Sequence, residues 1–223
     1  MNPHRPANFD PIARPYRWLE YLTFGSILEH CRFHFLHKLS THRRALILGD
    51  GDGRFTTRLL TANPQITIDA VDSSAAMLNL LTARATQLGP SATERLRTIH
   101  SDALAFQPEG EPYDLVVTHF FLDCLTNEDL NILIAKLRPH LTPGATWLVS
   151  EFAIPPTQPT KTIARTVIAA LYHAFRILTG LKTQRLPDYT SALGVLGFSR
   201  TYKKIFLGDL LTAELWRLNS QPR

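Results

Sequence analysis

The chain has 223 residues, of which 44% are hydrophobic and 19% are charged. That length is enough for one domain with a substantial buried core, and that composition excludes an intrinsically disordered protein. Two cysteines are too few for a disulfide framework, and the formal net charge of +5 is spread along the chain, so we expect a cytoplasmic protein with no nucleic-acid partner.

The sequence carries no signal for secretion or for crossing a membrane. Residues 1–10 are polar and lack the apolar core of a signal peptide. The longest apolar stretch, residues 163–181, is interrupted by Arg165, His173 and Arg176, so it suits a packed helix better than a transmembrane segment. The positive charge is still compatible with peripheral contact to an anionic membrane surface.

Strand and helix patterns alternate through the middle of the chain, after a helix expected at Tyr16–Leu39 with a break at Thr23–Gly25. The expected strands are five short apolar runs: Arg44–Gly49, Ile66–Asp72, Leu96–His100, Tyr113–Thr118 and Ala145–Glu151. The expected helices between them are Phe55–Ala62, Ser74–Leu88 and Asn127–Leu137, the last capped by Thr126. Strands that alternate with helices pair in parallel through right-handed crossovers, so this pattern predicts a doubly wound α/β sheet.

The last part of the chain departs from this alternation. A helix expected at Thr162–Leu178 carries one apolar stripe, and two strand-like runs follow it at Phe198–Phe206 and Leu210–Leu218. Only three residues separate these two runs, and so short a link joins antiparallel strands alone. The predicted fold is therefore one Rossmann-like domain with a doubly wound sheet of seven strands that ends in an antiparallel hairpin.

Polar groups gather where three of the expected strands end, which is where open α/β sheets bind ligands. The first strand is followed by Gly49-Asp50-Gly51-Asp52-Gly53, and this loop leads into a helix. The glycines lack side chains, so a ligand can approach their backbone closely, and the start of the helix offers free N–H groups. Asp72 ends the second strand and can accept hydrogen bonds from both ribose hydroxyls. It lies about twenty residues after the glycine loop, a spacing that suits NAD as well as S-adenosylmethionine (SAM). Asp102, after the third strand, can accept from an adenine amino group. The alternative is that both carboxylates only cap the turns that follow them.

These residues resemble the motifs of class I SAM-dependent methyltransferases. Residues 71–78 (VDSSAAML) are similar to their D-x-S-x-x-M-L segment, residues 100–103 (HSDA) to their adenine-binding segment, and residues 137–144 (LRPHLTPG) to their L-x-P-G-G turn. The resemblance implies SAM as the cofactor and a core that binds it at residues 41–151. It implies a cofactor site that contains Gly49, Gly51, Gly53, Asp72, Met77, Asp102 and Ala103. We expect four neighbouring residues to complete this site: Asp50, Ser73, Thr118 and His119.

One position departs from the family pattern. An acidic residue usually precedes the first glycine of the loop by two positions, and here that residue is Ile47. Either Asp50 or Asp52 supplies the missing carboxylate, or cofactor binding is weakened. We favour Asp50, because an ammonium group without a partner is costly in a dry pocket.

The N-terminal segment has a narrower resemblance. Residues 9–13 (FDPIA), Tyr16 and residues 23–25 (TFG) are similar to the entry segment of the ubiquinone/menaquinone biosynthesis C-methyltransferases, although the spacing before the glycine is one residue short. This resemblance implies a helical lid at residues 1–40 that folds over the cofactor, with Tyr16 and Phe24 beside it. Residues 152–223 then supply a substrate-side helix and the C-terminal hairpin.

Catalysis is expected at the end of the fourth strand, where the methyl group should point. His119 is the best candidate for a general base and Asp123 for orienting its imidazole; the alternatives are a histidine that only forms hydrogen bonds and a carboxylate that only caps a loop. Glu151 is a further polar candidate, and no metal site is expected, although His30, His34 and His37 fall on one helical face.

The function predicted is SAM-dependent methylation, at carbon or oxygen, of a small apolar or aromatic molecule. A non-catalytic SAM-binding or scaffold protein is the alternative that Ile47 supports. An RNA methyltransferase fits less well, because no Asn/Asp-Pro-Pro-aromatic motif follows the fourth strand and no basic domain is present.

Overall fold

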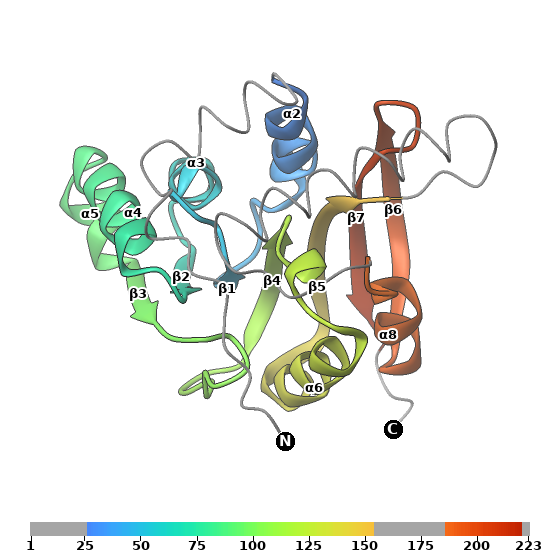
Figure 1. Cartoon of the computed structure of the whole chain (residues 1–223). Helices are drawn as coiled ribbons and strands as arrows, with labels where there is room; N and C mark the ends of the chain where they lie inside the picture. The colour runs from blue at the N-terminus through green and yellow to red at the C-terminus, as the bar shows by residue number, and fades with distance from the viewer. Residues whose placement is uncertain (1–25, 154–185, 220–223) are drawn as a thin grey trace.

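A computed structural model describes residues 26–153 and 186–219 of the chain (Figure 1). The strands are β1 (Arg44–Leu48), β2 (Thr67–Asp72), β3 (Leu96–His100), β4 (Tyr113–His119), β5 (Leu141–Phe152), β6 (Phe198–Phe206) and β7 (Leu211–Leu218). The α-helices are α2 (Ile27–Phe33), α3 (Arg54–Ala62), α4 (Ala75–Gln87), α5 (Pro90–Glu94), α6 (Asn127–Leu137) and α8 (Tyr189–Val195). Short 3₁₀ helices are η2 (Leu36–Lys38), η3 (Leu122–Cys124) and η4 (Arg138–His140).

The strands form one seven-stranded sheet in the order β3-β2-β1-β4-β5-β7-β6. The first five strands pair in parallel, while β7 runs antiparallel to both β5 and β6. The strand order reverses between β1 and β4, so the ligand-binding crevice of such a sheet is expected where these two strands end. This arrangement confirms the predicted doubly wound sheet and its C-terminal hairpin.

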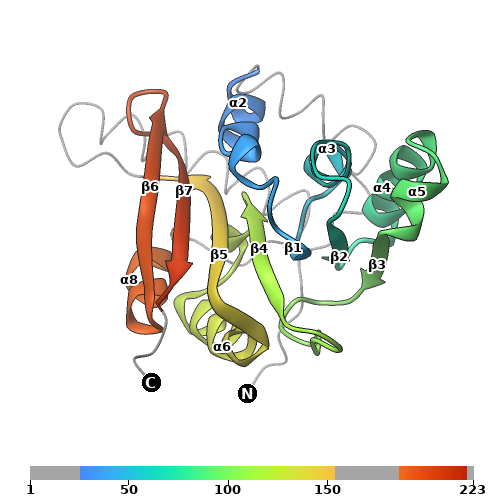
Figure 2. The ribbon, with the colours of Figure 1, turned by 180° about the vertical axis from the view of Figure 1, so that it is seen from behind.

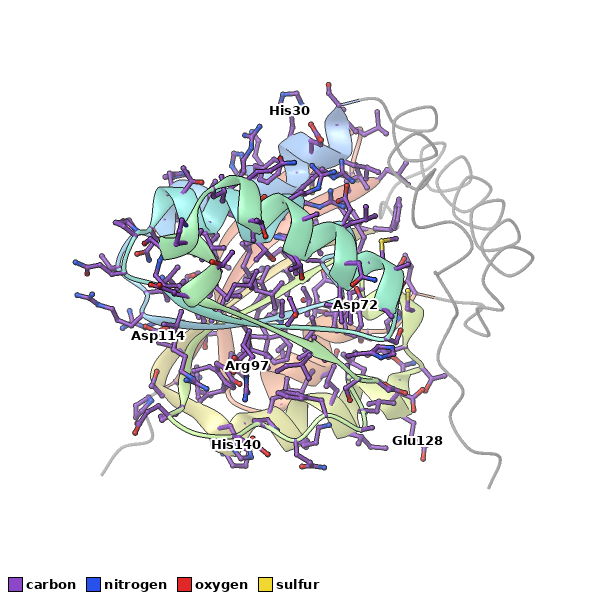
Figure 3. The ribbon with its side chains drawn as sticks, turned by 90° about the vertical axis from the view of Figure 1, so that its left-hand side faces the viewer. His30, Asp72, Arg97, Asp114, Glu128 and His140 are labelled. Atoms are coloured by element: carbon purple, nitrogen blue, oxygen red, sulfur yellow. The ribbon has the colours of Figure 1, made fainter. Side chains whose placement is uncertain are left out.

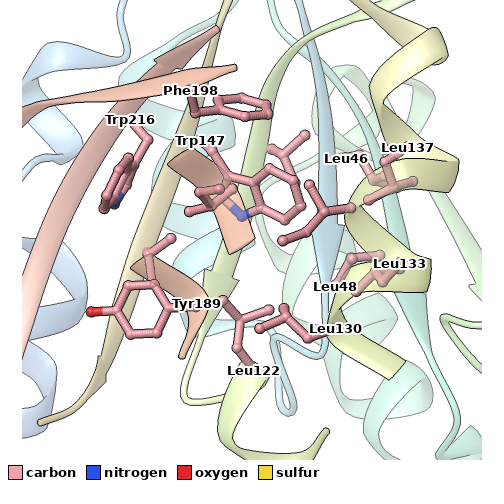
Figure 4. Close-up of a cluster of buried hydrophobic side chains, with 14 of the residues drawn as sticks. Leu46, Leu48, Leu122, Leu130, Leu133, Leu137, Trp147, Tyr189, Phe198 and Trp216 are labelled. Carbon is pink, nitrogen blue, oxygen red and sulfur yellow. The ribbon is translucent and has the colours of Figure 1, made fainter. Parts of the chain in front are cut away.

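Helices cover both faces of the sheet and create two hydrophobic cores (Figures 1 and 2). On one face, α3 and α4 pack on β1 and β2 through residues such as Phe55 and Leu81, and α2 packs over β7 and β5. On the other face, α6 and α8 pack around Trp147 of β5, whose ring meets that of Phe198 edge-on at 5.7 Å between centroids (Figure 4). Within the described ranges, 26–153 and 186–219, no helix has both the length and the apolar character to cross a membrane.

Side-chain caps fix where several helices begin. Thr126 and Asp129 form a reciprocal capping box at the start of α6, as the sequence predicts for Thr126. Ser74 accepts a hydrogen bond from the backbone N–H of Met77, and Asp188 accepts from that of Ser191. These caps satisfy backbone donors that a helix end leaves without partners.

The structure corrects several element boundaries. The first described helix ends at Phe33 and continues only as η2, whereas the sequence predicts a helix up to Leu39. Strand β5 begins at Leu141 instead of Ala145, because the chain bulges there: β4 pairs Tyr113 with Leu141 and next Leu115 with Thr146. Helices α5 and α8 are short and were not predicted. The predicted helices at residues 16–25 and 162–178 lie outside the described residues.

Candidate active site

The predicted cofactor residues come together at the carboxyl ends of the central strands. Figure 3 shows Asp72, the last residue of β2, at one edge of the sheet, and Asp114, near the start of β4, at the opposite edge. The loop of residues 49–53 follows β1 at the same edge as Asp72, because β1 and β2 are parallel and in register from Arg44 and Thr67 onward.

The three glycines of this loop have different structural roles. All three have positive φ, between 62° and 79°, which disfavours any other residue. A side chain at Gly49 would overlap the ring of Phe121, and one at Gly53 would overlap Leu81 of α4 and reach 2.9 Å from its Cα. A Cβ on Gly51 would meet only the sulfur of Met77, at 3.8 Å. Gly49 and Gly53 therefore serve packing, and Gly51 is the position where a ligand can approach the backbone.

The two aspartates of the loop also differ. Asp50 Oδ2 accepts hydrogen bonds from the backbone N–H and the hydroxyl of Thr56, at 2.8 and 2.6 Å, so the carboxylate caps α3. Its other oxygen, Oδ1, is buried and has no hydrogen-bond partner in the part of the chain that the structure describes. Burial raises the pKa of Asp50, while the positive charge of Arg32 opposes this shift. An acceptor that lacks a donor beside Gly51 is suited to an ammonium group.

Asp52 has a structural role. It is 4% exposed and forms ion pairs with Arg54 at 2.9 Å and with Arg84 of α4 at 2.7 Å. Arg54 in turn binds Glu29 of α2 at 2.9 Å. Asp52 thus ties the loop to two helices, and both of its oxygens already have cationic partners.

The predicted ribose and adenine residues lie on adjacent strand ends. Asp72 pairs in the sheet with His100, two residues before Asp102. Asp72 accepts from the backbone N–H of Ser74 at 2.8 Å, and Asp102 accepts from that of Leu104 at 2.9 Å. Each carboxylate therefore stabilises the turn that follows it, which was the alternative to a role in cofactor binding. Both carboxylates also lie at the strand ends where ribose and adenine are expected to bind. The carbonyl of Ser73 accepts a hydrogen bond from His100 Nε2 at 3.1 Å, and Ala103 is buried.

Lys136 of α6 is a residue that the sequence did not reveal as part of this region. Its ammonium donates to three carbonyl oxygens of the loop after β3, those of Ala103, Leu104 and Phe106, at 2.8, 2.8 and 2.6 Å. A lysine on an amphipathic helix normally indicates a solvated face, so no local pattern signals this contact. Lys136 holds the predicted adenine segment against α6.

His119 and Thr118 end β4 on opposite faces of the sheet. Thr118 is fully buried and its hydroxyl accepts a hydrogen bond from Trp147 at 3.0 Å. His119 is 3% exposed, and its ring meets that of Phe55 at 4.4 Å between centroids. Both ring nitrogens of His119 are buried and have no hydrogen-bond partner among the described residues. Burial, reinforced by the positive charge of Arg32, lowers the pKa of His119 well below its usual value, so the imidazole is neutral.

The expected hydrogen bond between Asp123 and His119 is not formed, which corrects the role predicted for Asp123. Neither ring nitrogen of His119 has a partner among the described residues, and the chain turns sharply after β4, where Phe120 has a φ of 52°. Such a conformation is strained for a residue with a side chain, and strain of this kind gathers at functional sites.

Asp123 instead belongs to a buried group with Cys124 and Glu151. Glu151 Oε1 accepts from the backbone N–H groups of Phe121 and Leu122, at 3.0 and 2.7 Å, while its Oε2 is buried and, in the described portion, has no partner. Burial raises the pKa of Glu151 well above its usual value, and the charge of Asp123 raises it further. Burial also raises the pKa of Asp123 to about 6. The geometry therefore brings a carboxyl pair to the end of β4 and β5.

The predicted lid residues and the three histidines near α2 add no further group to the part of this site that the structure describes. Tyr16 and Phe24, the predicted lid residues, lie outside the described residues. His30, His34 and His37 fall on α2, its end and η2, and no group of three metal-binding side chains occurs within residues 26–153 and 186–219.

Comparison with known proteins identifies the central part of the chain. Residues 46–147 match the family model described as a methyltransferase domain. This part of the chain is therefore similar to known methyltransferase domains. The match begins within β1, ends within β5 and includes the glycine loop, Asp72 and Asp102, and it supports the methyltransferase class predicted from the sequence motifs. No curated protein matches the chain.

Solved structures of methyltransferases and related proteins share the fold of this chain at low sequence identity. The pyocyanin biosynthetic protein PhzM has a TM-score of 0.64 and 16% identity over 95% of this chain and 62% of its own. An O-methyltransferase family 2 protein from Planctomyces limnophilus, in complex with apigenin, has a TM-score of 0.68 and 17% identity over 92% and 61%. The N-methyltransferase NodS from Bradyrhizobium japonicum, in complex with S-adenosyl-L-homocysteine, has a TM-score of 0.58 and 15% identity over 86% and 87%. The chain thus spans about six-tenths of the first two proteins.

Proposed function

We propose that this chain transfers the methyl group of SAM to a small apolar or aromatic molecule, at a carbon or an oxygen atom. The observation that carries the proposal is the open backbone at Gly51 beside the buried acceptor of Asp50, at the sheet edge that also holds Asp72 and Asp102. The methyltransferase domain supplies the reaction class. The names of two similar structures, one bound to apigenin and one that takes part in pyocyanin biosynthesis, refer to small aromatic molecules, which supports such an acceptor.

The residues present suit the parts of the cofactor. When bound, SAM supplies an electrophilic methyl group on a positively charged sulfur. Asp50 would accept from its ammonium group through Oδ1, and this would compensate for Ile47, which is 1% exposed and wholly apolar. Asp72 would accept from the ribose hydroxyls, and Asp102 with Ala103 would read the adenine amino group.

Asp123 is a better candidate for a general base than His119. A general base works best when its pKa lies near the operating pH, and the pKa of Asp123 is raised to about 6. The pKa of His119 is lowered well below its usual value, so its imidazole takes up a proton poorly near neutral pH. We therefore infer that Asp123 receives the proton of a hydroxyl or enol acceptor, and that neutral His119 offers a hydrogen bond to the cofactor. Glu151 holds the turn that carries Asp123.

A non-catalytic SAM-binding role is the second candidate, and Ile47 is the observation that favours it. Without an acidic residue at that position, the chain could retain the cradle and lose turnover. The resemblance to the ubiquinone/menaquinone C-methyltransferases rests on residues 9–25, outside the described part, so quinols are one class of acceptor to test.

The decisive experiment separates binding from turnover. SAM is titrated into the full chain by calorimetry, and the chain is then incubated with SAM and a panel of quinols, phenols, amines and thiols while S-adenosylhomocysteine is measured. We expect SAM binding, and turnover with a phenol or quinol that Asp123→Asn reduces without changing SAM affinity. Binding without turnover on every acceptor would favour the non-catalytic role, and no binding by folded protein would overturn both.

A further inference from the structure

A groove at the opposite edge of the sheet has the chemistry of an anion site. Its volume is about 740 Å³, within the range of small-molecule sites, and it lies between η2 and the strands β5, β7 and β6. Thr146 of β5 lines the groove, and Glu151 lies five residues further along the same strand. At roughly 3.3 Å per residue, these two residues are about 17 Å apart. A ligand in this groove would therefore not touch the loop of residues 49–53.

The groove carries positive charge and no negative charge. Lys38, Arg217 and His42 line it, and none of its lining residues is acidic. The ammonium of Lys38 lies 4.1 Å from the ring centroid of Tyr202, and the guanidinium of Arg217 lies beside Gly144, where a Cβ would come within 3.4 Å of Nη2. Burial lowers the pKa of His42, although the charge of Asp114 opposes that shift, so Lys38 and Arg217 are the permanent charges.

No carboxylate in residues 26–153 or 186–219 neutralises either of these two cations. Among the described residues, Lys38 and Arg217 have no carboxylate partner within ion-pair distance. Elsewhere in the described residues, each of three buried carboxylates forms ion pairs with two cationic side chains. Those sets are Asp52 with Arg54 and Arg84, Asp69 with Arg44 and Arg97, and Glu214 with Arg200 and Lys203.

The remaining lining groups suit an organic phosphate. Thr41 and Thr146 add hydroxyl donors, and a phosphate monoester is a dianion whose oxygens accept several charge-assisted hydrogen bonds at once. Leu39 and Leu215 give the groove an apolar floor, against which the organic part of the ligand can pack. We propose that this groove binds a small organic phosphate, at a site separate from the methyl-transfer site.

The test uses phenyl phosphate and inorganic phosphate as probes, with phenol as the uncharged control. Each is titrated into the full chain by calorimetry at constant ionic strength, and into Lys38→Gln/Arg217→Gln. The matched control is Arg58→Gln/Lys204→Gln, which removes the same net charge from side chains that do not line the groove. Thermal unfolding followed by circular dichroism establishes that both double variants fold.

We expect phenyl phosphate to bind more tightly than inorganic phosphate, and phenol not to bind. The groove variant should lose at least ten-fold in affinity, and the control variant should keep the affinity of the parent chain. Amide chemical shifts of the parent chain should move at residues 38–42, 201–202 and 215–217. Equal losses in both double variants would show a response to net charge alone and overturn the proposal. Shifts confined to residues 49–53, or binding of a short single-stranded RNA without binding of phenyl phosphate, would overturn it too.

Discussion

Replacing the two aspartates of the glycine loop one at a time should separate cofactor binding from stability. Asp50→Ala removes the acceptor Oδ1 beside Gly51, which we assign to the cofactor ammonium. A hydrogen bond to a charged group contributes about 1.5–3 kcal/mol, which corresponds to a Kd for SAM that rises about ten- to a hundred-fold. Loss of the cap on Thr56 should also lower the free energy of unfolding by about 1 kcal/mol.

Asp52→Ala should have the opposite profile. It leaves Arg54 and Arg84 without their shared partner, and removing one member of a buried ion pair costs about 3–5 kcal/mol. Because the side chain of Arg84 is 36% exposed, we expect the lower end of that range. The Kd for SAM of the folded variant should stay close to that of the parent chain.

Calorimetry with SAM and urea unfolding measure the two quantities on the same preparations. Thr56→Val is the matched control, because it removes one hydrogen bond to Asp50 Oδ2 and keeps Oδ1 in place. It should lower stability and leave SAM affinity unchanged. Equal, small changes in Kd for Asp50→Ala and Asp52→Ala would refute the assignment of Asp50 to the cofactor.

Three further substitutions test other parts of the site. Gly51→Ala should weaken SAM binding and lower the free energy of unfolding by about 1 kcal/mol, because Gly51 has a positive φ. Gly53→Ala should lower the free energy of unfolding much more, because its Cβ would overlap Leu81. Calorimetry with SAM and urea unfolding measure the two effects. Lys136→Met should raise the Kd for SAM by releasing the adenine segment, and Lys136→Arg should restore part of the affinity. Turnover should fall as the pH drops below about 6, because protonated Asp123 cannot accept a proton, and Asp123→Asn should remove this dependence.

Each of these expectations has a clear contrary result. Equal stability of the two glycine variants would contradict the packing role of Gly53. An unchanged Kd in Lys136→Met would mean that the adenine segment keeps its shape without α6. A pH profile that Asp123→Asn does not alter would show that Asp123 is not the general base.

The sequence alone predicted the sheet because its signal is local. Runs such as Ala45–Leu48 are apolar without alternation, as is typical of strands covered on both faces. The short link between Phe206 and Leu211 forces β6 and β7 to run antiparallel. The sequence also placed Gly49–Gly53, Asp72 and Asp102 at one edge, since parallel strands carry their carboxyl ends to the same side. Short elements such as α5 and α8 lack that periodic signal.

The division of roles inside the site could not be predicted, because it depends on which side chains from distant elements meet. Only the tertiary structure shows Arg84 on Asp52, and only the packed α6 shows Lys136 on the loop after β3. Asp123 and His119 form no hydrogen bond although only three residues lie between them, and the positive φ of Phe120 redirects the chain at this point. Sequence spacing determines which strand end a residue occupies, and burial and neighbouring charge then determine whether it can bind a ligand or a proton.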